Sequence, residues 1–166
     1  MYQHILLAVA LQQVEDSSSH ALAARKVAVS LAKGSGAKLT VLNVYDYDTV
    51  DTALSLPPEE LSRYRDSQII RIDEIMEQKM KTFLAVREAV EVPIAHMLKV
   101  GEPRTLIINT AEKLGADLLV IGAHNKRGLF DVLLGGTAAY ISRHAPCPVV
   151  LVHPKAVEKG KTAAMP

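Results

Sequence analysis

A strand, a loop of glycines and cations, and a helix follow one another between residues 116 and 137, an order typical of phosphate sites. The apolar run Leu118 to Ile121 predicts a buried parallel strand, which Gly122 ends. A glycine turn before a helix leaves backbone N–H groups free to meet an anion, and the helix dipole adds to that attraction. The segment therefore predicts a phosphate-bearing ligand. Its candidate binding residues are Gly122, His124, Asn125, Lys126, Arg127, Gly135, Gly136 and Thr137.

Some of these residues also have an interpretation that involves no ligand. His124 is either a phosphate contact or a surface histidine at the exit of a strand. Lys126 and Arg127 are either phosphate contacts or solvated loop charges, and contact is favoured only by the glycines around them. The sequence contains no Gly-x-Ser-x-Gly elbow and suggests no catalytic triad or acid–base pair. It therefore favours binding over strong catalysis.

Composition limits the classes of protein to which the chain can belong. Its 166 residues suffice for one full core, and a net charge of +1 provides no broad basic surface for nucleic acid. The single cysteine, Cys147, excludes an internal disulfide and is expected to be a buried, inert thiol. The sequence shows no signal peptide and no apolar run of the roughly 20 residues that span a bilayer, so we expect a cytoplasmic protein without membrane insertion.

Apolar periodicity predicts alternating strands and helices along the chain. Ser17, Ser18 and Ser19 are suited to cap the first helix, and Met76 and Met80 are expected to fill the core. The tail from Pro154 onward has little apolar content and is predicted to be disordered. The predicted strands are Ile5 to Ala10, Leu39 to Tyr45, Pro93 to Val100, Leu118 to Ile121 and Val149 to Val152. The predicted helices end near Lys33, span about 59 to 89, and run from Arg104 to Leu114 and from Thr137 to His144.

This order predicts an α/β fold, a five-stranded parallel open sheet with helices on both faces and right-handed crossovers. In such sheets ligands bind beyond the carboxyl ends of the strands, where the strand order reverses. The loops after Ala10, Val44, Val100 and Ile121 should therefore surround the site. Val100 and Gly101, which precede the third helix, are expected to form part of its wall.

Several short motifs together give the chain a specific resemblance. They are Val100-Gly-x-Pro103, Gly122-x-His124, Leu133-Leu-Gly135 and the closing run His144-Ala-Pro-Cys-Pro-Val-Val-Leu-Val152. In this order the motifs resemble the universal stress protein family over about residues 2 to 153. We therefore expect one such domain over residues 1–153, followed by a tail over 154–166.

The resemblance implies a Rossmann-like fold of the adenine nucleotide alpha hydrolase type and a homodimer paired through the last strand, Val149, Val150, Leu151 and Val152. It also implies ATP or AMP as ligand, with Mg²⁺ as a candidate accompanying ion. Some members of the family bind no nucleotide. The sequence does not identify the regulatory protein partner that such a module implies.

The glycine motif of the nucleotide-binding branch is only partly present. That branch resembles Gly-x-x-Gly, nine further residues, and then Gly-Ser or Gly-Thr. Gly122 and Gly135 match at the correct spacing, whereas Asn125 replaces the second glycine and Gly136 replaces the hydroxyl residue. Asn125 is a mild departure because Asn tolerates positive φ. Thr137 offers an oxygen one residue later.

The first strand departs further from the family. Members often end it with an aspartate that helps hold the adenine and ribose, and this chain has Ala10 there. Asp16 either folds back into that role or joins Ser17 and Ser18 in capping the helix, which we favour. Val44 matches the position whose backbone meets adenine in nucleotide-binding relatives.

Three functions follow from these expectations. The first is a nucleotide-binding regulatory module of the stress response, whose loop conformation reports ATP or AMP occupancy to a partner. The second is a nucleotide-free dimer that acts only through protein contacts. The third is a slow ATP hydrolase assisted by a divalent metal. The intact spacing and the two cations favour the first, whereas Ala10 and Gly136 favour the second.

Overall fold

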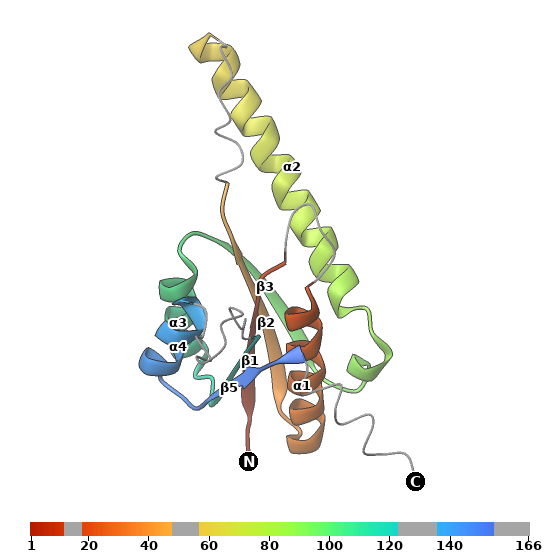
Figure 1. Ribbon diagram of the computed structural model, residues 1–166. Coiled ribbons are helices and arrows are strands. Elements are labelled where there is room, and N and C mark those ends of the chain that lie inside the picture. The colour runs from red at the N-terminus through yellow and green to blue at the C-terminus, as the bar shows by residue number, and fades with distance from the viewer. Residues whose placement is uncertain (12–17, 48–56, 123–135, 155–166) are drawn as a thin grey trace.

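The computed structural model describes residues 1–11, 18–47, 57–122 and 136–154. Within these residues five parallel strands form one sheet in the spatial order β3-β2-β1-β4-β5, with helices on both faces (Figure 1). The predicted α/β fold is confirmed. The strands are β1 His4–Val9, β2 Lys38–Tyr45, β3 Ile94–Val100, β4 Leu118–Gly122 and β5 Val149–Val152. The helices are α1 Ser19–Ser35, α2 Pro58–Leu84, the 3₁₀ helix η2 Arg87–Ala89, α3 Pro103–Leu114 and α4 Gly136–His144.

Most predicted boundaries agree with these bounds to within two residues, but the long second helix is shorter than predicted. The sequence predicts one helix over 59 to 89, whereas α2 ends at Leu84 and Val86 has an extended backbone. The turn brings Ala89 and Val92 back against the sheet, where both are buried. A straight helix would carry these apolar residues past the core, so burial overrides the local helical pattern.

The helices α1 and α2 cover one face of the sheet. Four small residues at three- and four-residue spacing, Ala21, Ala24, Ala28 and Ala32, form the buried side of α1 and allow its backbone to approach the strands closely. The helix begins at the N-cap Ser18, whose hydroxyl accepts a hydrogen bond from the Ala21 N–H, so the predicted serine cap is confirmed. Met76 and Met80 are fully buried, which confirms their predicted role in the core.

The helices α3 and α4 cover the opposite face. Alternate residues of β1 and β4, including Leu6 and Leu119, pack there against Ile107 of α3 and Ile141 of α4. Cys147 is half-buried beside this cluster, and burial raises the pKa of its thiol. The thiol therefore stays protonated near neutral pH, in keeping with the inert role expected from the sequence.

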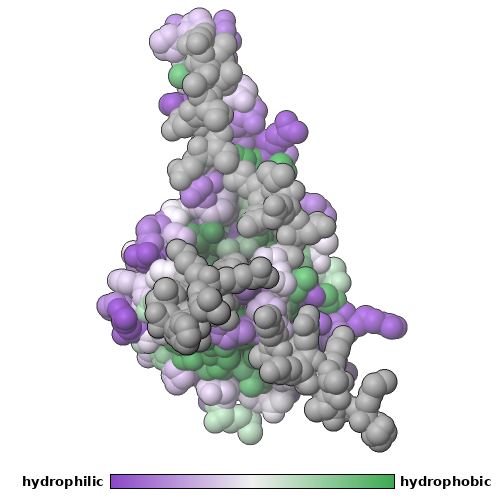
Figure 2. Space-filling model, in the orientation of Figure 1, coloured by the Kyte–Doolittle hydropathy of each residue, from purple (hydrophilic) through white to green (hydrophobic). Residues whose placement is uncertain are grey.

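The N-terminal half of α2 extends beyond the carboxyl edge of the sheet (Figure 1). Figure 2 shows mainly hydrophilic side chains on this projecting part. At the base of the projection, the hydroxyls of Tyr45 and Tyr47 donate hydrogen bonds of 2.6 and 2.7 Å to Oδ1 of Asp73. These two bonds tie α2 to the end of β2, beside the edge where ligands of parallel sheets bind.

Candidate functional site

The reversal of strand order lies between β1 and β4. From β1 the chain proceeds outward through β2 to β3, and it then returns to place β4 on the other side of β1. The chain therefore leaves the carboxyl end of β1 toward α1 on one face and that of β4 toward α4 on the other face. This divergence leaves a crevice at this point of the sheet. The observed topology thus places the expected site between residues that are more than a hundred positions apart in the sequence.

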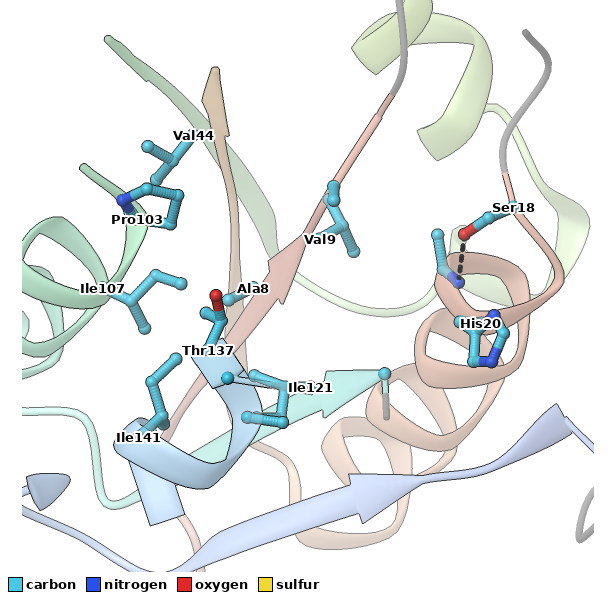
Figure 3. A pocket seen from close by; sticks show the side chains of 15 residues that line it. Ala8, Val9, Ser18, His20, Val44, Pro103, Ile107, Ile121, Thr137 and Ile141 are labelled. Carbon is cyan, nitrogen blue, oxygen red and sulfur yellow. Dashed lines mark hydrogen bonds between the residues drawn. The ribbon is translucent and has the colours of Figure 1, made fainter. Parts of the chain in front are cut away.

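A cavity of about 250 Å³ occupies this crevice. Figure 3 shows Val44, Pro103 and Ile107 on one side and Ser18 and His20 on the opposite side. The cavity is lined at the strand ends by Ala8, Val9, Ala10, Val44, Ile121 and Gly122, and on the helices and their caps by Ser18, His20, Ala21, Pro103, Ile107, Gly136, Thr137, Ala138 and Ile141.

The lining is mainly apolar, with a few polar groups among it. Among the described residues of the wall, the polar side chains are those of Ser18, His20 and Thr137. The Ser18 hydroxyl already accepts the capping bond from Ala21 at the start of α1 (Figure 3). Thr137 lies in the first turn of α4, where the backbone N–H groups have no partner within the helix. An apolar wall beside such groups suits a ligand with a flat apolar part and an anionic part.

The structure brings some of the predicted site residues together at the cavity and leaves others away from it. Ala10, Val44, Gly122, Gly136 and Thr137 line the cavity. The five remaining loop candidates, His124, Asn125, Lys126, Arg127 and Gly135, lie outside the described residues.

Val100 and Gly101, which the sequence suggested as wall residues, do not line the cavity. Val100 is exposed, and the Gly101 N–H donates a 3.0 Å hydrogen bond to the Tyr45 carbonyl oxygen. Gly101 has a φ of 140° and serves the turn into α3. From this segment the wall receives Pro103 instead.

Sequence reasoning missed the contribution of α1 and of the buried faces of α3 and α4. His20 and Ala21 enter the wall because the first turn of α1 packs against the end of β4. From the sequence, Ile107 and Ile141 could be identified only as core residues. The spacing of apolar residues on a helix is the same whether they face a cavity or pack against other side chains. Ile107 lies in the second turn of α3, whereas Ile141 lies past the middle of α4, so position within the helix does not identify both.

The wall at α3 is held by a well-formed helix start. The Glu102 carboxylate accepts hydrogen bonds from the backbone N–H groups of Arg104 and Thr105, at 3.1 and 2.8 Å. These bonds lower the pKa of Glu102, that with Thr105 most strongly, so the cap is charged at neutral pH. Pro103 occupies the first helical turn, where its missing N–H costs nothing.

The described residues offer few features of other classes of site. Within residues 1–11, 18–47, 57–122 and 136–154, no group of three or more His, Cys, Asp or Glu side chains could hold a metal ion. In the same ranges, no helix is both long and apolar enough to cross a membrane.

The parallel sheet, its switch point and the cavity beside two helix starts define an open α/β protein of the Rossmann-like class. The model of the universal stress protein family matches residues 1–153, and the chain belongs to that family. The resemblance seen in the sequence motifs is thereby confirmed.

Known relatives agree with this assignment. A universal stress protein of Methanocaldococcus jannaschii is 33% identical over 137 residues, which are 82% of this chain and 77% of that protein. The solved universal stress protein UspA from Lactobacillus plantarum has a TM-score of 0.60 and 30% identity, over 91% of this chain and 97% of the other. A solved universal stress protein in complex with cAMP shares the fold, with a TM-score of 0.56 and 24% identity over 92% of this chain and 98% of the other.

Proposed function

We propose that this universal stress protein binds an adenine nucleotide, ATP or AMP, in the cavity at its switch point and acts as a regulatory module of the stress response. The observation that carries the proposal is the position of the cavity. It joins the apolar end of β2, at Val44, to the first turn of α4, at Gly136 and Thr137. A base and a phosphate need these two environments within one site.

The apolar part of the cavity suits the base. Val44, Pro103 and Ile107 lie together on one side (Figure 3). The volume of about 250 Å³ lies just below the range of roughly 300 to 1,000 Å³ that is usual for small-molecule sites. The enclosed space therefore fits a base with part of a sugar, and the phosphates would lie at its rim.

The rim at α4 suits the phosphates. Gly136 begins the helix and adds no side chain between the ligand and the backbone, and Thr137 adds a hydroxyl donor. The N–H groups of the first turn, which have no partner within the helix, and the positive end of the helix dipole favour an anion at this place. The cAMP bound to one solved relative is an adenine nucleotide, which agrees in class with the proposed ligand.

The experiment is a titration of the purified protein with ATP, AMP and GTP, with and without Mg²⁺. ATP should raise the melting temperature as its concentration rises, because a ligand that binds only the folded state stabilises it by mass action. GTP should have a smaller effect if the apolar wall is selective for adenine. The absence of a thermal shift for ATP and AMP, together with no heat of binding, would contradict the proposal.

A matched pair of variants tests the location. Val44→Phe would fill the cavity from its wall and should weaken ATP binding by at least about tenfold. Val100→Phe places the same side chain at an exposed position outside the cavity and should leave affinity unchanged. Equal affinity in the two variants would place the nucleotide elsewhere.

A second candidate function is a nucleotide-free dimer that acts only through protein contacts, and one specific observation supports the dimer that it needs. The strand β5 lies at the edge of the sheet and pairs only with β4 among the described strands. Its residues Val149, Val150 and Leu151 are apolar and only partly buried. Such an edge can pair with the same strand of a second copy across a two-fold axis.

We propose this homodimer for both functions, and with it a cytoplasmic location, since the cytoplasm supplies adenine nucleotides. Residues 154–166 would then form a tail outside the domain. Nucleotide occupancy would act through a protein partner whose identity the sequence and the fold leave open.

A further inference from the structure

The side chain of Arg104 reaches from α3 to the first residue of α4. A Cβ atom built on Gly136 would lie 2.9 Å from Nη2 of Arg104 and 3.9 Å from its Cζ. Gly136 lines the cavity, whereas Arg104 itself does not, so the guanidinium lies next to a lining residue at the α4 end of the cavity. The glycine at 136 and the guanidinium are therefore a spatial pair, because any side chain at 136 would compete with Arg104 for this space.

Aromatic stacking along α4 orients the guanidinium. The Cζ of Arg104 lies 5.7 Å from the ring centroid of Tyr140, within the range of a cation–π contact. The Tyr140 ring is stacked on His144 at 4.1 Å, and Nδ1 of His144 donates a hydrogen bond to the Tyr140 carbonyl oxygen. Since Tyr140 is one helical turn beyond Gly136, this stack directs Arg104 along α4 toward the start of the helix.

The charge around Arg104 is incompletely compensated within the described residues. Its carboxylate partner there is Glu102, at 4.0 Å from Nε, and that carboxylate is already engaged by two backbone N–H groups at the start of α3. The guanidinium also lies beside the positive end of the α4 dipole, where a cation is disfavoured. An anion at the rim would be attracted by the guanidinium and by the helix at once.

We infer that Arg104 binds the phosphate of the proposed nucleotide and makes the site selective for phosphorylated ligands over nucleosides. This inference rests on the proposed function and adds a residue that lies outside the glycine loop. The planar guanidinium can donate two parallel hydrogen bonds to phosphate oxygens, whereas the apolar wall at Val44 and Ile107 is indifferent to phosphate. The guanidinium thereby takes the place that a side chain at Gly136 would otherwise fill.

The first experiment compares ATP, AMP and adenosine by calorimetry on the wild type and on Arg104→Gln. Glutamine keeps polarity but removes the charge, so affinity for ATP and AMP should fall by about tenfold or more. Adenosine affinity should be unchanged. Arg143→Gln removes the same charge from the last turn of α4 and should leave all three affinities as they are.

The second experiment uses the spatial pair. Gly136→Ala should displace the guanidinium and weaken ATP binding, while the fold should tolerate the methyl because the nearest atom is the end of a flexible side chain. In the Arg104→Gln background, Gly136→Ala should reduce ATP affinity less than it does in the wild type. This difference between the two reductions is the coupling that the double-mutant cycle measures. Melting temperatures of all four proteins serve to exclude a loss of folding as the cause.

The outcomes separate the inference from the function on which it rests. If the wild type binds ATP and Arg104→Gln binds it equally well, the role of Arg104 is overturned and the nucleotide site stands. If the wild type binds adenosine as tightly as ATP, the selectivity is overturned in the same way. If the wild type binds none of the three ligands, the proposed function fails and the role of Arg104 fails with it.

Discussion

The His20 backbone lies directly over Gly122. A Cβ atom at Gly122 would be 3.0 Å from both the Cβ and the carbonyl oxygen of His20, at the start of α1. From the sequence, glycine at this position suggests close approach of a phosphate ligand. The structure adds a second reason, because a side chain at residue 122 would press on the His20 backbone and force the first turn of α1 away from the end of β4.

We therefore expect Gly122→Val to destabilise the fold as well as alter the site. The branched side chain would have to displace the helix backbone, and overpacking of this kind costs about 1–3 kcal/mol in free energy of unfolding. Gly34→Ala is the control, since nothing lies within 4 Å of a Cβ at that helical position. It should stabilise the protein by up to about 1 kcal/mol. Denaturant midpoints that do not separate the two variants would contradict this packing.

The buried His4 predicts a loss of stability at mildly acidic pH. Its Nδ1 donates to the Leu114 carbonyl oxygen at 3.0 Å, and Nε2 accepts from the Thr40 hydroxyl at 2.8 Å. Burial lowers the pKa of His4 below its ordinary value of 6.5, so the unfolded chain takes up a proton more readily than the folded one. The stability that the neutral His4 ring contributes is fully present above the pKa of His4 in the unfolded chain, and it is lost as pH falls below that value.

Denaturant unfolding between about pH 8 and about pH 5 measures this dependence. His4→Gln removes the titrating ring, and its stability should fall less steeply with decreasing pH than that of the wild type. Carboxylates titrate in both proteins, so the difference between the two curves isolates His4. Parallel curves would show that His4 is not the source.

The Asp73 carboxylate should contribute to the attachment of α2. It accepts hydrogen bonds from Tyr45 and Tyr47, and Asp73→Ala would leave both hydroxyls without this acceptor. We expect a loss of about 1–3 kcal/mol in free energy of unfolding, with a smaller loss for Asp73→Asn, which keeps an acceptor oxygen. Asp66→Ala, at an exposed position of the same helix, controls for helix propensity. Equal losses at positions 66 and 73 would show that the two tyrosine hydrogen bonds do not hold α2 in place.

A proline in β5 should test the proposed dimer. The Leu119 N–H donates to the Pro148 carbonyl oxygen, so by the alternation of a parallel ladder the N–H groups of Val149 and Leu151 point away from β4. Leu151→Pro removes one outward donor and no bond to β4, and edge strands tolerate proline. If the substitution weakens the dimer to a dissociation constant in the millimolar range, a protein concentration of tens of micromolar lies roughly 10- to 100-fold below that constant. Light scattering at this concentration should then show a monomer.

One further protein completes that measurement, and one obvious variant is unsuitable. Removal of residues from 155 onward should leave the dimer intact, since the proposed interface ends at Val152. Val152→Lys is a poor test because Val152 is buried within the chain itself, and lysine there would unfold the edge of the sheet. A dimer that survives Leu151→Pro, or a wild-type monomer, would overturn pairing through β5.

The sequence was sufficient for the fold because the signals of its elements are local. Apolar runs such as Leu118 to Ile121 and the alternation of strand and helix patterns predict a parallel sheet before any contact is known. Motifs at fixed spacing were sufficient for the family, and the match over residues 1–153 agrees with them. The strand ends Ala10 and Val44 could be placed at the site because carboxyl ends of parallel strands share one edge.

Tertiary structure alone decided the remainder, because those features depend on distances between residues far apart in the chain. The end of α2 is set by the burial of Ala89 and Val92, and the glycine at 122 is required by the approach of His20. Arg104 looks like an exposed helix residue in the sequence until α4 brings Gly136 beside its guanidinium. Close packing between elements creates each of these requirements, and no local pattern of residue types encodes it.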